Sequence, residues 1–196
     1  MASLPGAVAV EADFLEPGAA DRLLDQVDKQ LGPLDVLVNN AGHAEQEDTF
    51  TTLDQDGVER TLRVNLTAPA MLMAEFSRRV PHDAPESSKS VVNISTDAAR
   101  SFPGQVAYGA SKGALESLTR GAALDLGPVT RVNAVAPGPV QTGWMSEEMV
   151  ESVTPTIPLG RVGTPQDIAD AVVFLASDQA RWINGQVIQV AGGHWL

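Results

Sequence analysis

The chain has 196 residues, 43% of them hydrophobic, and a formal net charge of −12, so it suits one folded domain and not a disordered chain. The acidic balance argues against nucleic acid and anionic membranes as partners. The sequence has no cysteine, its three histidines are scattered, and it shows neither a signal pattern nor a long apolar run. We therefore expect no metal site, no disulfide, and a soluble cytoplasmic protein.

Short β-rich runs alternate with longer amphipathic runs along the chain. Strands are expected at residues 8–12, 34–38, 88–95, 131–136 and 186–190. Helices are expected at residues 17–31, 54–80, 106–126, 146–152 and 164–176, with Thr164 as the cap of the last and a kink at Pro69. Apolar strands that alternate with helices predict a doubly wound, mostly parallel, Rossmann-like sheet in a single α/β domain spanning residues 1–196.

A tyrosine and a lysine lie four residues apart at the start of the expected helix 106–126. At this spacing Tyr108 and Lys112 share one helix face. A lysine charge so close favours the phenolate, so we expect a lowered pKa for Tyr108 and a role as general acid/base. The spacing alone is common, and an amphipathic tyrosine beside a solvated lysine is the structural alternative.

Polar or glycine-containing segments also follow the expected strands. Asp13 follows the first, Asn40-Ala41-Gly42 the second, Ser95-Thr96 the third, and Pro137-Gly138 the fourth. Ligands of parallel α/β sheets bind beyond the carboxyl ends of the strands. We therefore expect a ligand site where these segments meet the first turn of the helix that carries Tyr108.

Five ordered motifs together resemble the short-chain dehydrogenase/reductase family over nearly the whole chain. They are Leu37-Val38-Asn39-Asn40-Ala41-Gly42, Val64-Asn65-Leu66, Asn93-Ile94-Ser95, Tyr108-Gly109-Ala110-Ser111-Lys112 and Val132-Asn133-Ala134-Val135-Ala136-Pro137-Gly138. The resemblance implies interconversion of a carbonyl and a secondary alcohol with NAD or NADP. It also implies a small-molecule substrate and a homodimer or homotetramer.

The resemblance assigns catalytic roles to specific residues. Tyr108 is the acid/base, Lys112 lowers its pKa and holds the nicotinamide ribose, and Asn65 holds a water in a proton relay. The hydroxyl that orients the carbonyl is Ser95 by its distance of thirteen residues from Tyr108, or Thr96 as the second hydroxyl of the motif. The distance rule places Ser95 slightly ahead.

The resemblance also assigns the cofactor site and a lid. Asp13 is expected at the adenine, Asn40, Ala41 and Gly42 near the adenosine, and Tyr108 and Lys112 at the nicotinamide half. Four further residues flank the nicotinamide carboxamide: Pro137, Gly138, Val140 and Thr142. Trp144, Met145 and Met149 are expected in a substrate lid, with satellite core packing as the alternative.

The chain departs from the family pattern at its start. It has no glycine-rich phosphate loop, and it begins at what resembles the third strand, so a βαβ unit and the residue that selects NAD or NADP are missing. It is therefore either a piece of a normal enzyme, a fragment that folds differently, or a non-catalytic remnant. In the last case the long helices 54–80 and 106–126 would serve as a dimerising interaction module.

A remote alternative is a serine hydrolase. Gly109-Ala110-Ser111-Lys112-Gly113 fits the G-x-S-x-G pattern, and an aspartate (Asp167, Asp170 or Asp178) followed by His194 satisfies the chain order. That pattern needs a strand directly before the serine, whereas residues 103–108 read as a turn into a helix.

Overall fold

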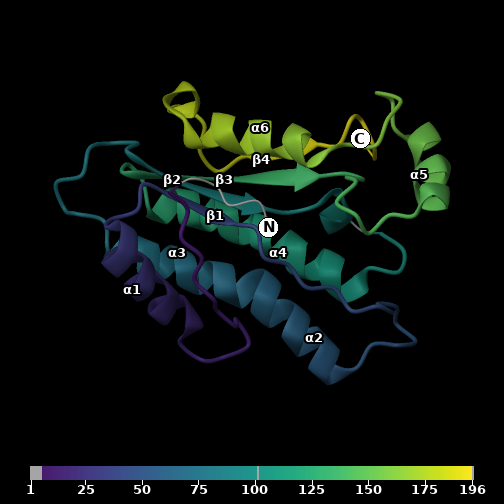
Figure 1. The fold of residues 1–196 in the computed structure, drawn as a ribbon, viewed down its shortest axis with the longest axis horizontal. Coiled ribbons are helices and arrows are strands. Elements are labelled where there is room, and N and C mark those ends of the chain that lie inside the picture. The colour runs from purple at the N-terminus through teal and green to yellow at the C-terminus, as the bar shows by residue number, and fades with distance from the viewer. Residues whose placement is uncertain (1–5, 101, 196) are drawn as a thin grey trace.

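The computed structural model describes residues 6–100 and 102–195 and shows a parallel sheet between two helical layers (Figure 1). The strands are β1 (Val36–Asn39), β2 (Lys89–Ile94), β3 (Thr130–Pro137) and β4 (Val187–Val190). The α-helices are α1 (Ala19–Leu31), α2 (Gln55–Leu62), α3 (Ala68–Arg78), α4 (Val106–Asp125), α5 (Glu147–Val153) and α6 (Pro165–Ala176). The predicted doubly wound α/β fold is confirmed, as is the capping box of Thr164 and Asp167 on α6.

The sheet keeps its strands in chain order, β1-β2-β3-β4, all parallel. The prediction of a strand at residues 8–12 is wrong. These residues pair with no strand and are mostly exposed. A parallel strand exists only where a neighbour supplies a hydrogen-bonding ladder, and in the described residues no strand lies beyond β1. β1 is therefore an edge strand, with Val36 39% exposed and Val38 41% exposed.

Apolar side chains fill both faces of the sheet. Val91 of β2 joins a cluster with α1 and α3, whereas its neighbour Val92 joins a cluster with α6, as the alternation of a strand requires. The first cluster contains Ala20, Leu24, Leu37, Leu72, Met73, Phe76, Val91, Ala123 and Val132. The second contains Val92, Val135, Leu175 and Ala180. Strands covered on both faces explain the uninterrupted apolar runs in the sequence.

The expected kink at Pro69 takes the form of a π-helical turn, Arg63–Thr67, between α2 and α3. Proline has no N–H, so Pro69 cannot donate to the carbonyl of Asn65 four residues earlier. The Ala68 N–H instead reaches the carbonyl of Arg63, five residues back. The extra residue in this turn places Asn65 on the buried face.

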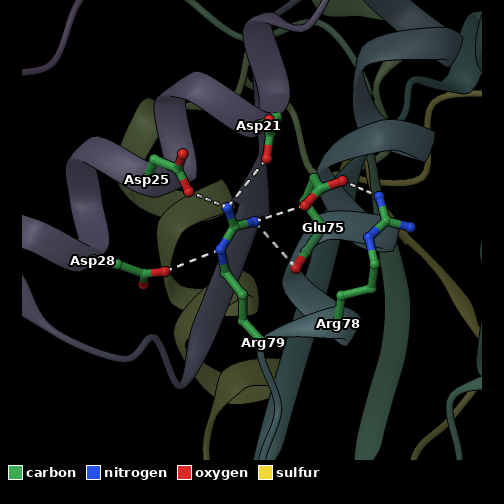
Figure 2. A network of polar contacts seen from close by, with 6 residues as sticks. All are labelled: Asp21, Asp25, Asp28, Glu75, Arg78 and Arg79. Atoms are coloured by element: carbon green, nitrogen blue, oxygen red, sulfur yellow. Dashed lines mark hydrogen bonds and ion pairs between the residues drawn. The ribbon is translucent and has the colours of Figure 1, made fainter.

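An ion-pair network joins α1 to the end of α3 (Figure 2). The Arg79 guanidinium contacts Asp25 at 2.6 Å, Asp28 at 3.0 Å and Glu75 at 2.9 Å, and it also reaches Asp21. Arg78 pairs with the second oxygen of Glu75. Because the α1 carboxylates are substantially exposed, water and salt screen this network.

Two absences hold within residues 6–100 and 102–195. None of the helices there has the length and apolar character needed to cross a membrane. Nor does any trio of histidine or acidic side chains in those ranges come together in a way that could hold a metal ion.

Candidate active site

The first turn of α4 is fixed by a buried carboxylate, Asp48. Its two side-chain oxygens accept the backbone N–H groups of Ala107 and Tyr108, each at 2.8 Å, and its carbonyl accepts that of Val106 at 3.1 Å. Three amides that lack partners within the helix are thereby satisfied. Sequence reasoning missed Asp48, because it lies about sixty residues before the turn and no local pattern marks it.

Lys112 lies one turn further along α4 and is buried. Its Nζ is 5.9 Å from the centre of the Tyr108 ring and donates a 2.7 Å hydrogen bond to the carbonyl of Ile94 at the end of β2. Burial lowers the pKa of Lys112 to about 8, because a charged ammonium is poorly solvated there. The structure thus brings Tyr108 and Lys112 together, as predicted.

The expected lowering of the Tyr108 pKa is wrong. Burial raises its pKa, the negative charge of Asp97 raises it further, and only the interaction with the Thr96 hydroxyl acts in the opposite direction. The ammonium of Lys112 is drawn to the Ile94 carbonyl and does not offset these effects. Tyr108 is therefore protonated at neutral pH.

Asn65 is fully buried and its side chain is held on three sides. Its Oδ1 accepts the His43 N–H at 2.7 Å, and its Nδ2 donates to the His43 carbonyl at 2.8 Å and to the Ser111 hydroxyl at 2.9 Å. A Cβ on Gly42 would stand 3.8 Å from both Asn65 Oδ1 and Lys112 Nζ. Gly42, Asn65 and Lys112 therefore border one small space.

The two candidate hydroxyls after β2 point to different partners. Ser95 is buried and donates to Glu116 Oε1 on α4 at 2.8 Å. Thr96 donates to Asp97 Oδ1 at 3.3 Å, and its hydroxyl lowers the pKa of Tyr108. The electrostatics thus favour Thr96, whereas the distance rule favours Ser95.

Asn40, Ala41 and Gly42 follow β1 as exposed backbone, as expected for a segment that a ligand approaches. The buried asparagine of this motif is Asn39, which the sequence did not single out. Its Nδ2 donates to Asn93 Oδ1 at 2.8 Å, and Asn93 in turn donates to Thr119 at 2.9 Å. This chain of amides ties β1 to β2 and α4.

Pro137 ends β3, and Gly138 and Val140 follow it; all three are half-buried, whereas Thr142 is exposed. Gly138 has a packing reason to be glycine, since a Cβ there would stand only 2.7 Å from the Cβ of Ala191. Val140 forms an isolated bridge to Gly163. These contacts fix the direction in which the chain leaves β3.

Asp13 does not follow a strand, because the strand expected before it is absent. It lies in an exposed turn, where its Oδ1 accepts the Leu15 N–H at 2.9 Å. The structure therefore gives Asp13 a local role, and the strand-end argument for a ligand contact is wrong for this residue.

The proposed lid lies beyond the carboxyl end of β3, around α5 (Figure 1). Trp144 and Met149 are exposed, whereas Met145 is buried. Met145 therefore fits the packing alternative, and the other two side chains are free to contact a ligand.

The serine hydrolase alternative is wrong. Ser111 lies inside α4 with no strand before it, and its buried hydroxyl donates to the Tyr108 carbonyl at 2.7 Å. His194 pairs with Asp97 and not with any of the three aspartates of the proposed triad.

Comparison with known proteins decides the family. The family model described as enoyl-(acyl carrier protein) reductase matches residues 1–194. The chain belongs to the short-chain dehydrogenase/reductase family. Among its relatives is the uncharacterized oxidoreductase YjdA of Bacillus subtilis, 36% identical over 186 residues that cover 94% of this chain and 74% of the relative.

Solved short-chain dehydrogenase/reductase structures share the fold. A blue fluorescent protein from a metagenomic library, in complex with NADPH, is 33% identical with a TM-score of 0.85 over 94% of this chain and 74% of its own. A 4-hydroxyisoleucine dehydrogenase in complex with NADH is 32% identical with a TM-score of 0.84 over 95% of this chain and 79% of its own. The resemblance seen in the sequence is thus confirmed, and the chain is a member of a family of NAD(P)-dependent oxidoreductases.

Proposed function

We propose that this short-chain dehydrogenase/reductase interconverts a small-molecule carbonyl and a secondary alcohol, with Tyr108 as acid/base and NAD or NADP as redox partner. The observation that carries the proposal is the pairing of Tyr108 with the buried Lys112, whose Nζ lies 5.9 Å from the centre of the tyrosine ring and binds the Ile94 carbonyl at the end of β2. Both residues lie on α4, whose first turn is held by Asp48. The complexes of similar proteins with NADPH and NADH support the cofactor.

The residues present fit the nicotinamide half of such a cofactor. The space beside Gly42 is bordered by Asn65 Oδ1 and Lys112 Nζ. An ammonium has three N–H donors, and the Ile94 carbonyl takes one of them. Lys112 can therefore hold ribose hydroxyls, with exposed Asn40 and Ala41 toward the adenosine and Pro137, Gly138, Val140 and Thr142 toward the carboxamide.

A nicotinamide held at this site would supply the hydride for reduction of the carbonyl carbon. Tyr108 gives its proton to the carbonyl oxygen, and Thr96 orients that oxygen by a hydrogen bond, with Ser95 behind it on Glu116. Because the pKa of Tyr108 is raised, the proton is in place at neutral pH. The reverse oxidation needs the tyrosinate, so its rate is expected to rise with pH through the alkaline range.

Asn65 is proposed to hold a relay water through its backbone. Both of its side-chain N–H groups and its Oδ1 already have protein partners. Its backbone carbonyl has no α-helical donor, because Pro69 lacks an N–H. A water bound to this carbonyl would be the proposed relay between solvent and Lys112.

A non-catalytic role is the second candidate, supported by two observations. The sequence contains no glycine-rich phosphate loop, and Val36 and Val38 expose one face of the edge strand. In that role α2, α3 and α4 would form a homodimer contact. In the catalytic case the same helices serve a homodimer or homotetramer.

Two measurements separate these candidates. NADH and NADPH fluorescence is titrated against this chain, and carbonyl reduction is then followed in Tyr108→Phe. We expect binding in both proteins and a fall in kcat of at least about 100-fold in the variant. Ser88→Ala, which removes an exposed hydroxyl at the opposite end of β2, is the control with unchanged rate.

The outcomes are distinct. Absence of binding at millimolar cofactor would reject the oxidoreductase activity of this chain and favour the non-catalytic role. Full activity in Tyr108→Phe would reject only the role of Tyr108.

A further inference from the structure

The C-terminal segment folds back onto the loop that follows β2. His194 is buried there, the side chain of Asp97 is 9% exposed, and His194 Nδ1 lies 2.6 Å from Asp97 Oδ2. The Arg100 guanidinium donates to the Trp195 carbonyl at 3.0 Å, and the ring of Trp195 lies edge-on to Phe102 at 5.8 Å between ring centres. The pair is therefore built into the fold and is not a surface contact.

The second oxygen of Asp97 connects this pair to the proposed acid/base. Asp97 Oδ1 accepts the Thr96 hydroxyl at 3.3 Å, and Thr96 and Asp97 act on the pKa of Tyr108 in opposite directions. The hydrogen-bonded chain thus runs from His194 through Asp97 to Thr96. None of the five sequence motifs contains His194 or Asp97.

The chain matters because a threonine hydroxyl has only one proton. When Thr96 donates to Asp97, it cannot at the same time donate to a substrate oxygen or to the phenolate of Tyr108. A hydrogen-bond donor to Oδ2 of Asp97 makes the carboxylate a weaker acceptor at Oδ1, so the Thr96 hydroxyl is held there less strongly. His194 is placed to be this donor.

We propose that His194 and Asp97 form a positioning pair that sets the direction in which the Thr96 hydroxyl donates its proton. The inference rests on the proposed function only in calling Tyr108 the acid/base, since the coupling itself is a property of the folded chain. It adds the C-terminal segment to the parts of the molecule that control the site.

The other charged groups near Tyr108 are engaged elsewhere. Lys112 donates to the Ile94 carbonyl, and the Asp48 carboxylate accepts two backbone N–H groups, one of them from Tyr108 itself. Asp97 is the carboxylate whose charge raises the pKa of Tyr108. Glu116 on the same helix binds Ser95 instead.

The test uses the single tyrosine of the chain. A fluorotyrosine at position 108, whose phenol is more acidic, is titrated by fluorine NMR with circular dichroism as the check of folding. Asp97→Asn is expected to lower the midpoint by about one pH unit, because a neighbouring negative charge is lost. Glu116→Gln removes an equal charge from α4 and should leave the midpoint within about 0.2 unit.

A double-mutant cycle then tests His194. His194→Phe is expected to raise the midpoint by about half a unit, and to change it little in the Asp97→Asn background. His194→Gln retains an N–H donor and should stay near the wild-type midpoint, which keeps the test available if His194→Phe does not fold.

Either of two results would overturn the proposal: no shift in Asp97→Asn, or an equal effect of His194→Phe with and without Asp97. The titration needs neither cofactor nor substrate. Failure of the coupling is therefore distinguishable from failure of the proposed oxidoreductase activity.

Discussion

The central strand β3 and the edge strand β1 differ in how completely their side chains are covered. In β3 the side chains of Val132, Ala134, Val135 and Ala136 have no exposed surface, whereas Val36 and Val38 of β1 expose 39% and 41%. α6 lies over β2, β3 and β4, so the matching face of β1 has no helical cover. The proposed acid/base groups lie at the end of the covered strand β2, whereas the segment proposed for the adenosine follows the partly exposed strand β1.

The kinds of polar contact differ in the same way. Around α4, buried hydrogen bonds hold the groups proposed for proton transfer, among them those of Asp48 and Asn65. Around α1, exposed ion pairs of Arg79 carry much of the polar contact (Figure 2). Buried, fully bonded groups are costly to disturb, whereas screened pairs are not. The groups proposed for proton transfer thus lie where polar contacts are costlier to break.

The largest effect is expected at the carboxylate that caps α4. Asp48→Ala should lower the free energy of unfolding by about 2–4 kcal/mol, because it leaves two buried backbone amides without partners. Asp54→Ala, which removes the cap of α2 at a more exposed site, should cost only about 1 kcal/mol. Urea denaturation measures both losses. Equal losses would show that burial of the capped amides does not decide the cost.

Matched valine truncations compare the two strands directly. Val135→Ala should cost about 2–3 kcal/mol, from lost apolar burial and the cavity left behind. Val38→Ala should cost under about 1 kcal/mol, because its side chain already meets water. If the two variants unfold with the same loss, the open face of β1 is covered in solution.

A stabilising effect is expected from removing the buried lysine charge. Lys112→Met should raise the free energy of unfolding at pH 7 by about 1–2 kcal/mol, since an ammonium with a lowered pKa is buried at a cost. The folded-state pKa lies below the unfolded value, so the wild type gains stability as pH rises from about 8 toward its ordinary value. The advantage of Lys112→Met should disappear across that window.

The exposed Lys29→Met on α1 serves as the control for Lys112. It should change stability by less than about 0.5 kcal/mol at any of these pH values. A pH-independent gain in Lys112→Met would show that packing, not charge burial, is responsible.

The smallest effect is expected in the ion-pair network. Arg79→Gln should cost about 1 kcal/mol or less at low salt, and less still in about 1 M salt. Arg120→Gln, whose partner Glu116 lies 3.8 Å away, provides the comparison. A salt-independent loss of several kcal/mol would mean that the network is effectively buried.

The sequence predicted much of the fold, because the signals involved are local. Strand runs, the Thr164 cap and the spacing of Tyr108 and Lys112 all appear within a few residues. The strand expected at residues 8–12 failed because a strand also needs a partner, which its own residues cannot reveal. Local composition carries no information about whether that partner is present.

The proximity of Tyr108 and Lys112 was predictable from the sequence, but the electrostatics around them were not. The four-residue spacing correctly places Lys112 near Tyr108, yet the sign of the Tyr108 pKa shift depends on burial and on Asp97. Asp48 and His194 reach the site from distant segments, through contacts 60 and 97 residues apart in sequence. Such pairs have no local pattern to find.

The π-helical turn at Arg63–Thr67 holds one residue more than an α-helical turn, because the Ala68 N–H bonds to a carbonyl five residues back. In a regular α-helix an extra residue would rotate all that follows by about 100°, whereas the wider turn absorbs it. Deleting one residue within the turn should therefore restore a regular helix and leave Leu72, Met73 and Phe76 on the sheet. The change would fall mainly on the turn itself, where Asn65 lies.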